Sequence, residues 1–144
     1  MQAIHFSDMR SLETASNISL PFFDFGVAAG LPVYVSQAIE QRIDLNKELV
    51  INPASSFCVR VSGQSMIGAG IDDGDLLVVD RKLEAQNGKI VLAWLDGEFT
   101  VKRLKKALNR VWLQAENPAF DPIEVTDYHE FRIWGVVTGV IKKV

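Results

Sequence analysis

The sequence predicts a mainly β protein, with one compact domain preceded by a short extended N-terminal arm. Short runs of β-branched and apolar residues recur along the chain, and clusters of Gly, Asp or Pro separate them, as is usual for strands and turns. A hydrophobic fraction of 48% over 144 residues suffices for one domain with a sizeable core. None of the apolar runs is long enough to cross a bilayer as a helix.

The stretch from Phe57 to Asp80 contains the first two predicted strands, one at each end. Four glycines lie between them: Gly63, Gly68, Gly70 and Gly74. Glycine permits backbone conformations that other residues avoid, so a tight turn region is expected here. Ser65 lies within this region. Its hydroxyl can serve as a nucleophile, or it can simply form a hydrogen bond within its own loop, as most loop serines do.

Lys102 lies in a second informative stretch, the predicted strand Glu98–Lys105. Alternation along a strand places Thr100, Lys102 and Leu104 on the same face. A lysine with these neighbours can be partly buried, and burial lowers the pKa of an ammonium group. The neutral amine can then accept a proton from a serine. The alternative is that Lys102 begins a basic, solvated strand end.

The remaining elements follow from turn signals. Further strands are expected at Lys89–Leu95, Val111–Ala115 and Phe131–Ile141. Asp96-Gly97 predicts a two-residue hairpin turn, because both residues tolerate the positive φ that such turns need. Asn117-Pro118 and Asp121-Pro122 mark turns before the last strand. The C-terminal run is apolar on both faces in its second half, so it is either a central strand or one that pairs with a partner subunit.

The first 29 residues differ from the rest because they lack periodicity. Leu20–Phe25 is apolar but is interrupted by Pro and Asp, which favours an extended arm over a helix. Val27-Ala28-Ala29 is similar to a signal-peptidase site. Without a basic segment or an uninterrupted apolar core before it, secretion is not expected. Asp44 is expected to cap a short helix that ends at Leu49.

Charge and composition narrow the function classes. The net charge of −3 and a pI near 5.3 argue against a dedicated DNA-binding surface, which is normally basic. The single cysteine, Cys58, is expected in the core and suits a reducing compartment. One cysteine and two histidines offer no metal-ligand spacing. Asp72–Asp75 predicts a turn and lacks the pattern of a calcium loop. We therefore expect neither a metal nor a cofactor.

Three sequence blocks together resemble a known family. These are Ser-Gly-Gln-Ser-Met at 62–66, Asp-Asp-Gly-Asp at 72–75 and Glu-Phe-Thr-Val-Lys at 98–102. They are similar to the self-cleaving peptidase domain shared by LexA-type repressors and UmuD-type mutagenesis proteins, in which a serine and a lysine form the catalytic dyad. The separation of 37 residues between Ser65 and Lys102 matches that family. Residues 40–46, Glu-Gln-Arg-Ile-Asp-Leu-Asn, resemble UmuD-type proteins rather than repressors.

The resemblance covers nearly the whole chain and implies both a fold and a site. The fold is the curved, strongly twisted antiparallel sheet of the LexA/signal-peptidase-like type. Ser65 would be the nucleophile and Lys102 the base, and the bond cut would be Ala29–Gly30. Self-cleavage would remove the arm, residues 1–29, and leave the peptidase and dimerisation domain, residues 30–144. Preorganised donors would hold the oxyanion, and the backbone N–H groups of Ser65 and Gln64 are the expected ones.

The same resemblance implies partners and a cellular role. RecA filaments on single-stranded DNA would promote the cut, and the shortened homodimer would join a UmuC-type Y-family polymerase in the SOS response. The protein would be cytoplasmic, with no membrane contact and no direct DNA binding. Two other functions stay open: a non-cleaving binding module of the same fold, and a signal-peptidase-like protease. A serine–histidine pair that uses His5 or His129 is a further alternative.

Overall fold

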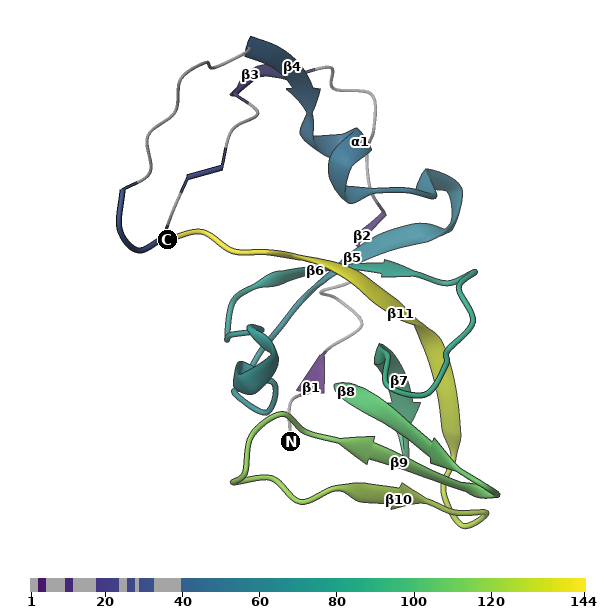
Figure 1. Ribbon diagram of the computed structural model, residues 1–144. Helices are drawn as coiled ribbons and strands as arrows, with labels where there is room; N and C mark the ends of the chain where they lie inside the picture. The colour runs from purple at the N-terminus through teal and green to yellow at the C-terminus, as the bar shows by residue number, and fades with distance from the viewer. Residues whose placement is uncertain (1–2, 5–9, 12–17, 24–25, 28, 33–39) are drawn as a thin grey trace. The chain divides into compact units, whose positions relative to one another are not determined.

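The computed structural model describes residues 3–4, 10–11, 18–23, 26–27, 29–32 and 40–144 (Figure 1). The chain divides into two compact units. The larger comprises Met1–Leu12 and Asn52–Val144, and the smaller comprises Glu13–Ile51. Strands dominate the described residues of both units, and helices are few and short. The predicted mainly β fold is therefore confirmed.

The larger unit contains a nine-stranded sheet in which every strand pairing is antiparallel. Its strands are β1 (Ala3–Ile4), β2 (Arg10–Ser11), β5 (Ser56–Arg60), β6 (Leu76–Asp80), β7 (Ile90–Leu95), β8 (Glu98–Ala107), β9 (Arg110–Gln114), β10 (Ile123–Val125) and β11 (Phe131–Ile141). The order is β10-β9-β8-β7-β11-β6-β5-β2, and β1 pairs with β8. Two 3₁₀ helices, η2 (Pro53–Ser55) and η3 (Ile67–Ala69), interrupt the strands. The sequence did not predict β10.

The C-terminal strand β11 is central in this sheet. Its first half pairs with β7 and its second half with β6, and the register shifts near Gly135. A Cβ at Gly135 would lie 2.6 Å from Cγ1 of Val79 and 2.8 Å from the carbonyl oxygen of Asp80. Only glycine permits so close an approach of β11 to β6. The strand is therefore central, as one of the two alternatives predicts, although its second half is only partly covered and Val140 stays exposed.

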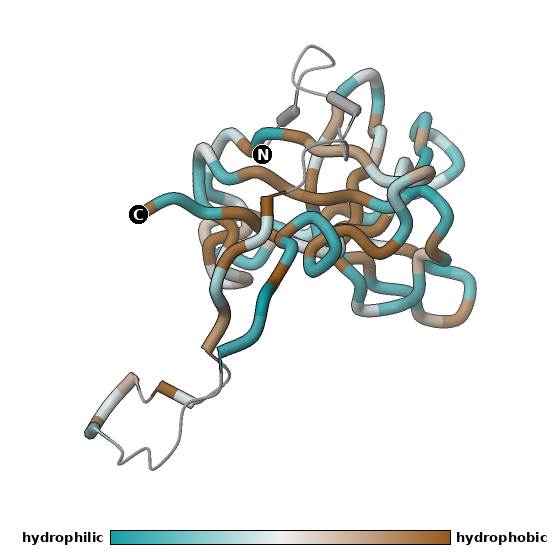
Figure 2. The backbone as a smooth tube through the Cα atoms, turned by 90° about the horizontal axis from the view of Figure 1, so that it is seen from above, coloured by the Kyte–Doolittle hydropathy of each residue, from teal (hydrophilic) through white to brown (hydrophobic). Residues whose placement is uncertain are grey.

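Two clusters of buried side chains form the core of the larger unit. One gathers residues from β5, β6, β7 and β8 around Phe99, and the other includes Leu104 and Leu113. In Figure 2 the long hydrophobic (brown) stretches of the tube run mostly through the middle of the larger unit, and hydrophilic (teal) stretches lie mostly in its outer loops. Because β8 contributes to both clusters, its side chains are buried on both faces from Phe99 to Lys102.

A hairpin turn fixes the register of β7 against β8. Asp96 and Gly97 have φ angles of 48° and 88°, so the predicted two-residue turn is confirmed. From this turn the pairing continues to Val91 opposite Lys102. The turn thus determines where along β8 the lysine lies.

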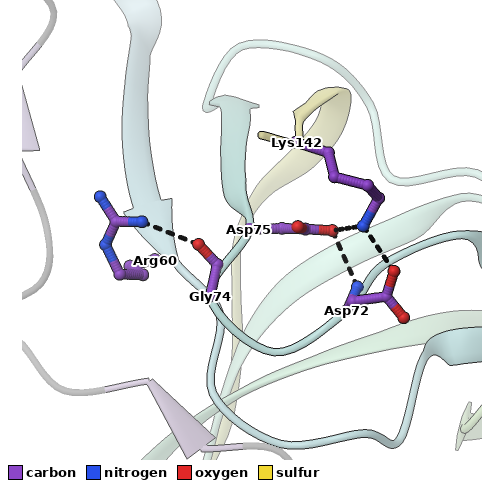
Figure 3. Close-up of polar contacts among 5 residues, drawn as sticks. All are labelled: Arg60, Asp72, Gly74, Asp75 and Lys142. Carbon is purple, nitrogen blue, oxygen red and sulfur yellow. Dashed lines mark hydrogen bonds and ion pairs between the residues drawn. The ribbon is translucent and has the colours of Figure 1, made fainter. Parts of the chain in front are cut away.

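The acidic turn Asp72–Asp75 is held from two sides (Figure 3). Nη1 of Arg60 donates to the carbonyl oxygen of Gly74 at 2.7 Å, and Nζ of Lys142 contacts the carboxylates of Asp72 and Asp75. Burial alone would raise the pKa of Asp75, but hydrogen bonds from Lys142 and the Asp72 backbone N–H lower it below its ordinary value. The turn prediction is confirmed. Through these side-chain contacts the turn links β5, which carries Arg60, to Lys142 just after β11.

The smaller unit contains a two-stranded sheet and one short helix. The strands β3 (Ser19–Phe23) and β4 (Glu40–Asp44) pair antiparallel, and helix α1 spans Leu45–Leu49. Oδ1 of Asp44 accepts a hydrogen bond from the backbone N–H of Asn46 at 3.0 Å, which confirms the predicted cap. The sequence did not predict β4. Within the described part of the chain, no helix has the length and apolar character needed to cross a membrane.

Candidate active site

Ser65 lies in the loop between β5 and β6, two residues before η3 begins at Ile67. Its neighbour Met66 is completely buried in the core with Val61 and Ile71, so the loop is anchored beside the serine. Gly63 and Gly70 have φ angles of 95° and 78°, as the glycine pattern predicts. Ser65 itself has no exposed surface, which differs from the surface position that a purely local loop role would give it.

Gly68 lies in the same loop, and the prediction that its backbone conformation requires glycine is wrong. Its φ does not lie in the left-handed region, so backbone conformation does not explain the glycine. A Cβ at this position would instead lie 2.6 Å from the backbone oxygen of Glu116. Gly68 therefore permits a close contact between the serine loop and the chain that follows β9.

The prediction that Cys58 belongs to the core is wrong, because its side chain on β5 is only half-buried.

Lys102 lies on β8, and only 1% of its surface is exposed. The sequence predicts partial burial, but both faces of β8 are covered and the burial is nearly complete. Desolvation disfavours the charged ammonium and lowers the pKa of Lys102 from 10.5 to about 8. The alternative of a solvated strand end is wrong for this residue, although Lys106 beyond it is exposed.

The structure brings Lys102 and Ser65 together. Nζ of Lys102 lies 3.0 Å from Oγ of Ser65, 2.7 Å from Oγ1 of Thr100 and 3.1 Å from the carbonyl oxygen of Val101. A protonated lysine donates one hydrogen bond to each of these three oxygens. A neutral amine has two N–H groups for Thr100 and Val101, and its lone pair can accept the Ser65 hydroxyl proton.

Thr100 is a site residue whose contact was not predicted. It is completely buried, and its hydroxyl makes the shortest of the three contacts to Nζ. The sequence did contain a signal for this contact, because Thr100 and Lys102 are two residues apart on a strand and such residues share a face. Thr100 and the Val101 carbonyl orient the amine, so the third direction around Nζ points to Ser65.

Histidine is not the partner of Ser65 within the described residues. Nδ1 of His129 accepts a hydrogen bond from the backbone N–H of Thr126 at 3.0 Å, and Nε2 lies 3.9 Å from a carboxylate oxygen of Asp96. These contacts hold a turn between β10 and β11. His5 lies outside the described residues.

Ala29 and Gly30 belong to the smaller unit, whereas Ser65 and Lys102 belong to the larger. Both Ala29 and Gly30 are exposed, and the space around a Cβ at Gly30 is open. Ala28 lies outside the described residues. An exposed bond between small residues is sterically accessible, but its approach to Ser65 stays a prediction.

The geometry around Ser65 and Lys102 defines a chemical class. A buried amine in contact with a buried hydroxyl can accept its proton and leave an alkoxide that attacks a carbonyl carbon. This is the chemistry of serine–lysine hydrolases. The chain belongs to the Peptidase S24-like family, whose model matches residues 21–138. Members of this family are self-cleaving serine peptidases.

The chain is similar to several LexA repressors. It is 47% identical over 118 residues to that of Ectopseudomonas mendocina (strain ymp), an alignment covering 81% of this chain and 57% of the relative. It is 41% identical over 145 residues to that of Mycolicibacterium vanbaalenii, covering 97% and 61%. Family membership is thus confirmed, and the chain spans about three-fifths of the length of these curated relatives. Membership of the UmuD type stays a prediction.

Proposed function

We propose that this protein is a serine peptidase that cuts its own Ala29–Gly30 bond, with Ser65 as nucleophile and Lys102 as base. The observation that carries the proposal is the buried 3.0 Å contact between Nζ and Oγ. With a pKa of about 8, roughly a tenth of Lys102 is neutral at pH 7. A base is therefore available under physiological conditions.

The reaction proceeds in two stages, acylation of Ser65 and then hydrolysis of the ester. Oγ of Ser65 bonds to the carbonyl carbon of Ala29 while its proton passes to Nζ of Lys102. The tetrahedral intermediate then breaks the bond to Gly30, and Lys102 returns the proton to the departing amine. Water, deprotonated by Lys102, hydrolyses the resulting ester and restores the serine. Backbone N–H groups of Ser65 and Gln64 hold the oxyanion, and such preorganised donors usually make a large contribution.

Gly30→Glu is expected to reduce self-cleavage at least about tenfold, because a large charged side chain would have to enter a buried site beside Lys102 and Ser65. The measurement is the appearance of the fragment beginning at Gly30, followed by mass spectrometry. Gly26→Glu is the matched control, because it adds the same charge in the same exposed segment, where a Cβ also meets open space. Processing of Gly30→Glu at the wild-type rate would place the cut elsewhere.

The proposed cellular role is that of an SOS mutagenesis protein in the cytoplasm. RecA filaments on single-stranded DNA promote the cut, and the processed homodimer serves as accessory subunit of a UmuC-type polymerase. The UmuD-like block at residues 40–46 supports this role, as does the net charge of −3. A second candidate is the peptidase part of a repressor, which the similarity to LexA repressors favours.

Binding experiments separate these two roles. RecA filaments are expected to accelerate Gly30-fragment formation, and the processed protein is expected to bind a UmuC-type polymerase and to show no salt-sensitive binding to duplex DNA. Fluorescence anisotropy at two salt concentrations and co-purification with the polymerase measure this. Failure to bind the polymerase would favour the repressor, and micromolar, salt-sensitive duplex binding would add to that evidence.

A further inference from the structure

Two consecutive residues after β9 hold the backbone on both sides of Ser65. The backbone N–H of Glu116 donates to the carbonyl oxygen of Ser65 at 2.9 Å. Nδ2 of Asn117 donates to the carbonyl oxygen of Gln64, also at 2.9 Å. The Gln64 carbonyl also accepts from the backbone N–H of Ile67 within the serine loop, at a longer 3.4 Å. Each of the two peptide groups that flank Ser65 therefore has its shorter hydrogen bond from outside this loop.

This arrangement sets the direction of a catalytically important group. A peptide unit is planar and trans, so its C=O and N–H point in opposite directions. The carbonyl of Gln64 and the N–H of Ser65 belong to one such unit. When Asn117 fixes that carbonyl, it also fixes the Ser65 N–H, which is the proposed oxyanion donor. The two fixed planes together set φ and ψ of Ser65, and thus the direction of its side chain.

The segment that carries Asn117 is held against the serine loop and against β8 by contacts of the preceding residue, Glu116. The backbone N–H of Gly68 donates to the carbonyl oxygen of Glu116 at 2.7 Å, and a Cβ at Gly68 would collide with that oxygen. The Glu116 carboxylate pairs with Arg103, whose Nη1 donates to the carbonyl oxygen of Gly88 at 2.7 Å. Arg103 follows Lys102 on β8, so this route connects the serine loop to the lysine strand independently of the Ser65–Lys102 contact.

We infer that Asn117 is a positioning residue for self-cleavage, acting through the Gln64 carbonyl to aim the Ser65 N–H at the developing oxyanion. It does not touch the reacting atoms in this role. The inference rests on the proposed function, because it assigns Asn117 a part in that reaction. A purely local role is the alternative, since Oδ1 of Asn117 accepts from the Ala119 N–H at 3.0 Å and so stabilises a turn.

Asn117→Asp separates the two roles. An aspartate keeps the oxygen that the Ala119 N–H needs, but it replaces the amide donor to Gln64 with an acceptor. Asn117→Ser is the uncharged counterpart, because its hydroxyl can still support the turn and is too short to replace the amide. We expect each variant to slow cleavage about tenfold to a hundredfold, less than the roughly 10²–10³-fold loss that follows outright removal of an oxyanion donor. Thermal unfolding is expected to stay close to that of the wild type.

The dependence of the cleavage rate on pH is the decisive readout. If the Ser65 N–H is misdirected, Asn117→Ser cleaves more slowly at every pH, and the midpoint of its pH–rate profile stays near that of the wild type. Loosening of the site would instead admit water and raise the pKa of Lys102 toward its ordinary value. Asn87→Asp controls for the added charge, because Oδ1 of Asn87 accepts from the Lys106 N–H in a hairpin contact that an aspartate retains.

The possible failures are distinguishable. If the wild type yields the Gly30 fragment and both Asn117 variants do so at the same rate, the positioning role is overturned and the proposed function stands. A shifted pH midpoint in Asn117→Ser also overturns the positioning role. If the wild type yields no Gly30 fragment, the proposed function fails and this role fails with it.

Discussion

Removal of either member of the Ser65–Lys102 pair is expected to stop self-cleavage. Ser65→Ala deletes the nucleophile, and we expect the rate to fall by a factor of roughly 10⁴ or more, as for other nucleophiles that act together with a base. The double variant with Lys102→Met is expected to lose little more than either single variant. The rate is measured as Gly30-fragment formation by mass spectrometry.

Lys102→Met gives a second, opposite effect on stability. The chain keeps a side chain of similar length, so the substitution leaves no large cavity. Folding lowers the pKa of Lys102 from 10.5 to about 8, so the unfolded chain binds its proton more tightly. Burial of the charge therefore opposes folding increasingly as the pH falls from 10.5 to about 8, and fully below that value. The methionine variant is therefore expected to be more stable at neutral pH, by about 1 to 3 kcal/mol.

Circular dichroism and thermal unfolding supply the controls for both variants. Retained β signal and unchanged or raised Tm show that the loss of cleavage is chemical and not a failure to fold. Ser65→Ala that still forms the Gly30 fragment at the wild-type rate would exclude Ser65 as nucleophile. A Lys102→Met variant that cuts normally would exclude the lysine as base.

The pH dependence of cleavage is expected to follow the deprotonation of Lys102. Only the neutral amine can accept the serine proton, and burial lowers the pKa of Lys102 to about 8. The rate should therefore climb about tenfold per pH unit below that value and level off above it. In the absence of any RecA filament, cleavage is expected to be slow in weak acid. The measurement is fragment formation from about pH 6 to about pH 10, within the range that the fold tolerates.

A histidine base gives a different profile. An ordinary imidazole has a pKa near ~6.5, so its rate would level off around neutrality. His129→Ala is the matched test, and it is expected to leave the profile unchanged because His129 contacts the turn at Thr126. A plateau reached by about pH 7.5 and lost in His129→Ala would contradict the lysine assignment.

Much of the fold was predictable because its signals are local. Alternating apolar runs located β7, β8, β9 and β11, and Asp96-Gly97 located the hairpin that sets the register of Lys102. The strand β10 has only three residues, which pair with β9 but show no periodicity of their own. Because its stability comes from that pairing, a local pattern does not reveal it.

The candidate site was predictable in part for the same reason. The spacing and the blocks around Ser65 and Lys102 indicated the pair, and the structure places the two side chains in contact. The sequence underestimated the burial of Lys102, because alternation distinguishes two faces but does not show that both are covered. Asn117 was predicted only as a turn residue. Its contact with Gln64 spans 53 positions, so it depends on tertiary structure.

The intact mass of the purified wild-type chain after incubation near pH ~9 tests the central claim most directly, since Lys102 is then largely neutral. We predict two fragments whose masses add up to the intact chain plus one water, the larger beginning at Gly30, and an unchanged mass for Ser65→Ala treated in parallel. An uncut wild-type chain, or the same fragments from Ser65→Ala, would contradict the account.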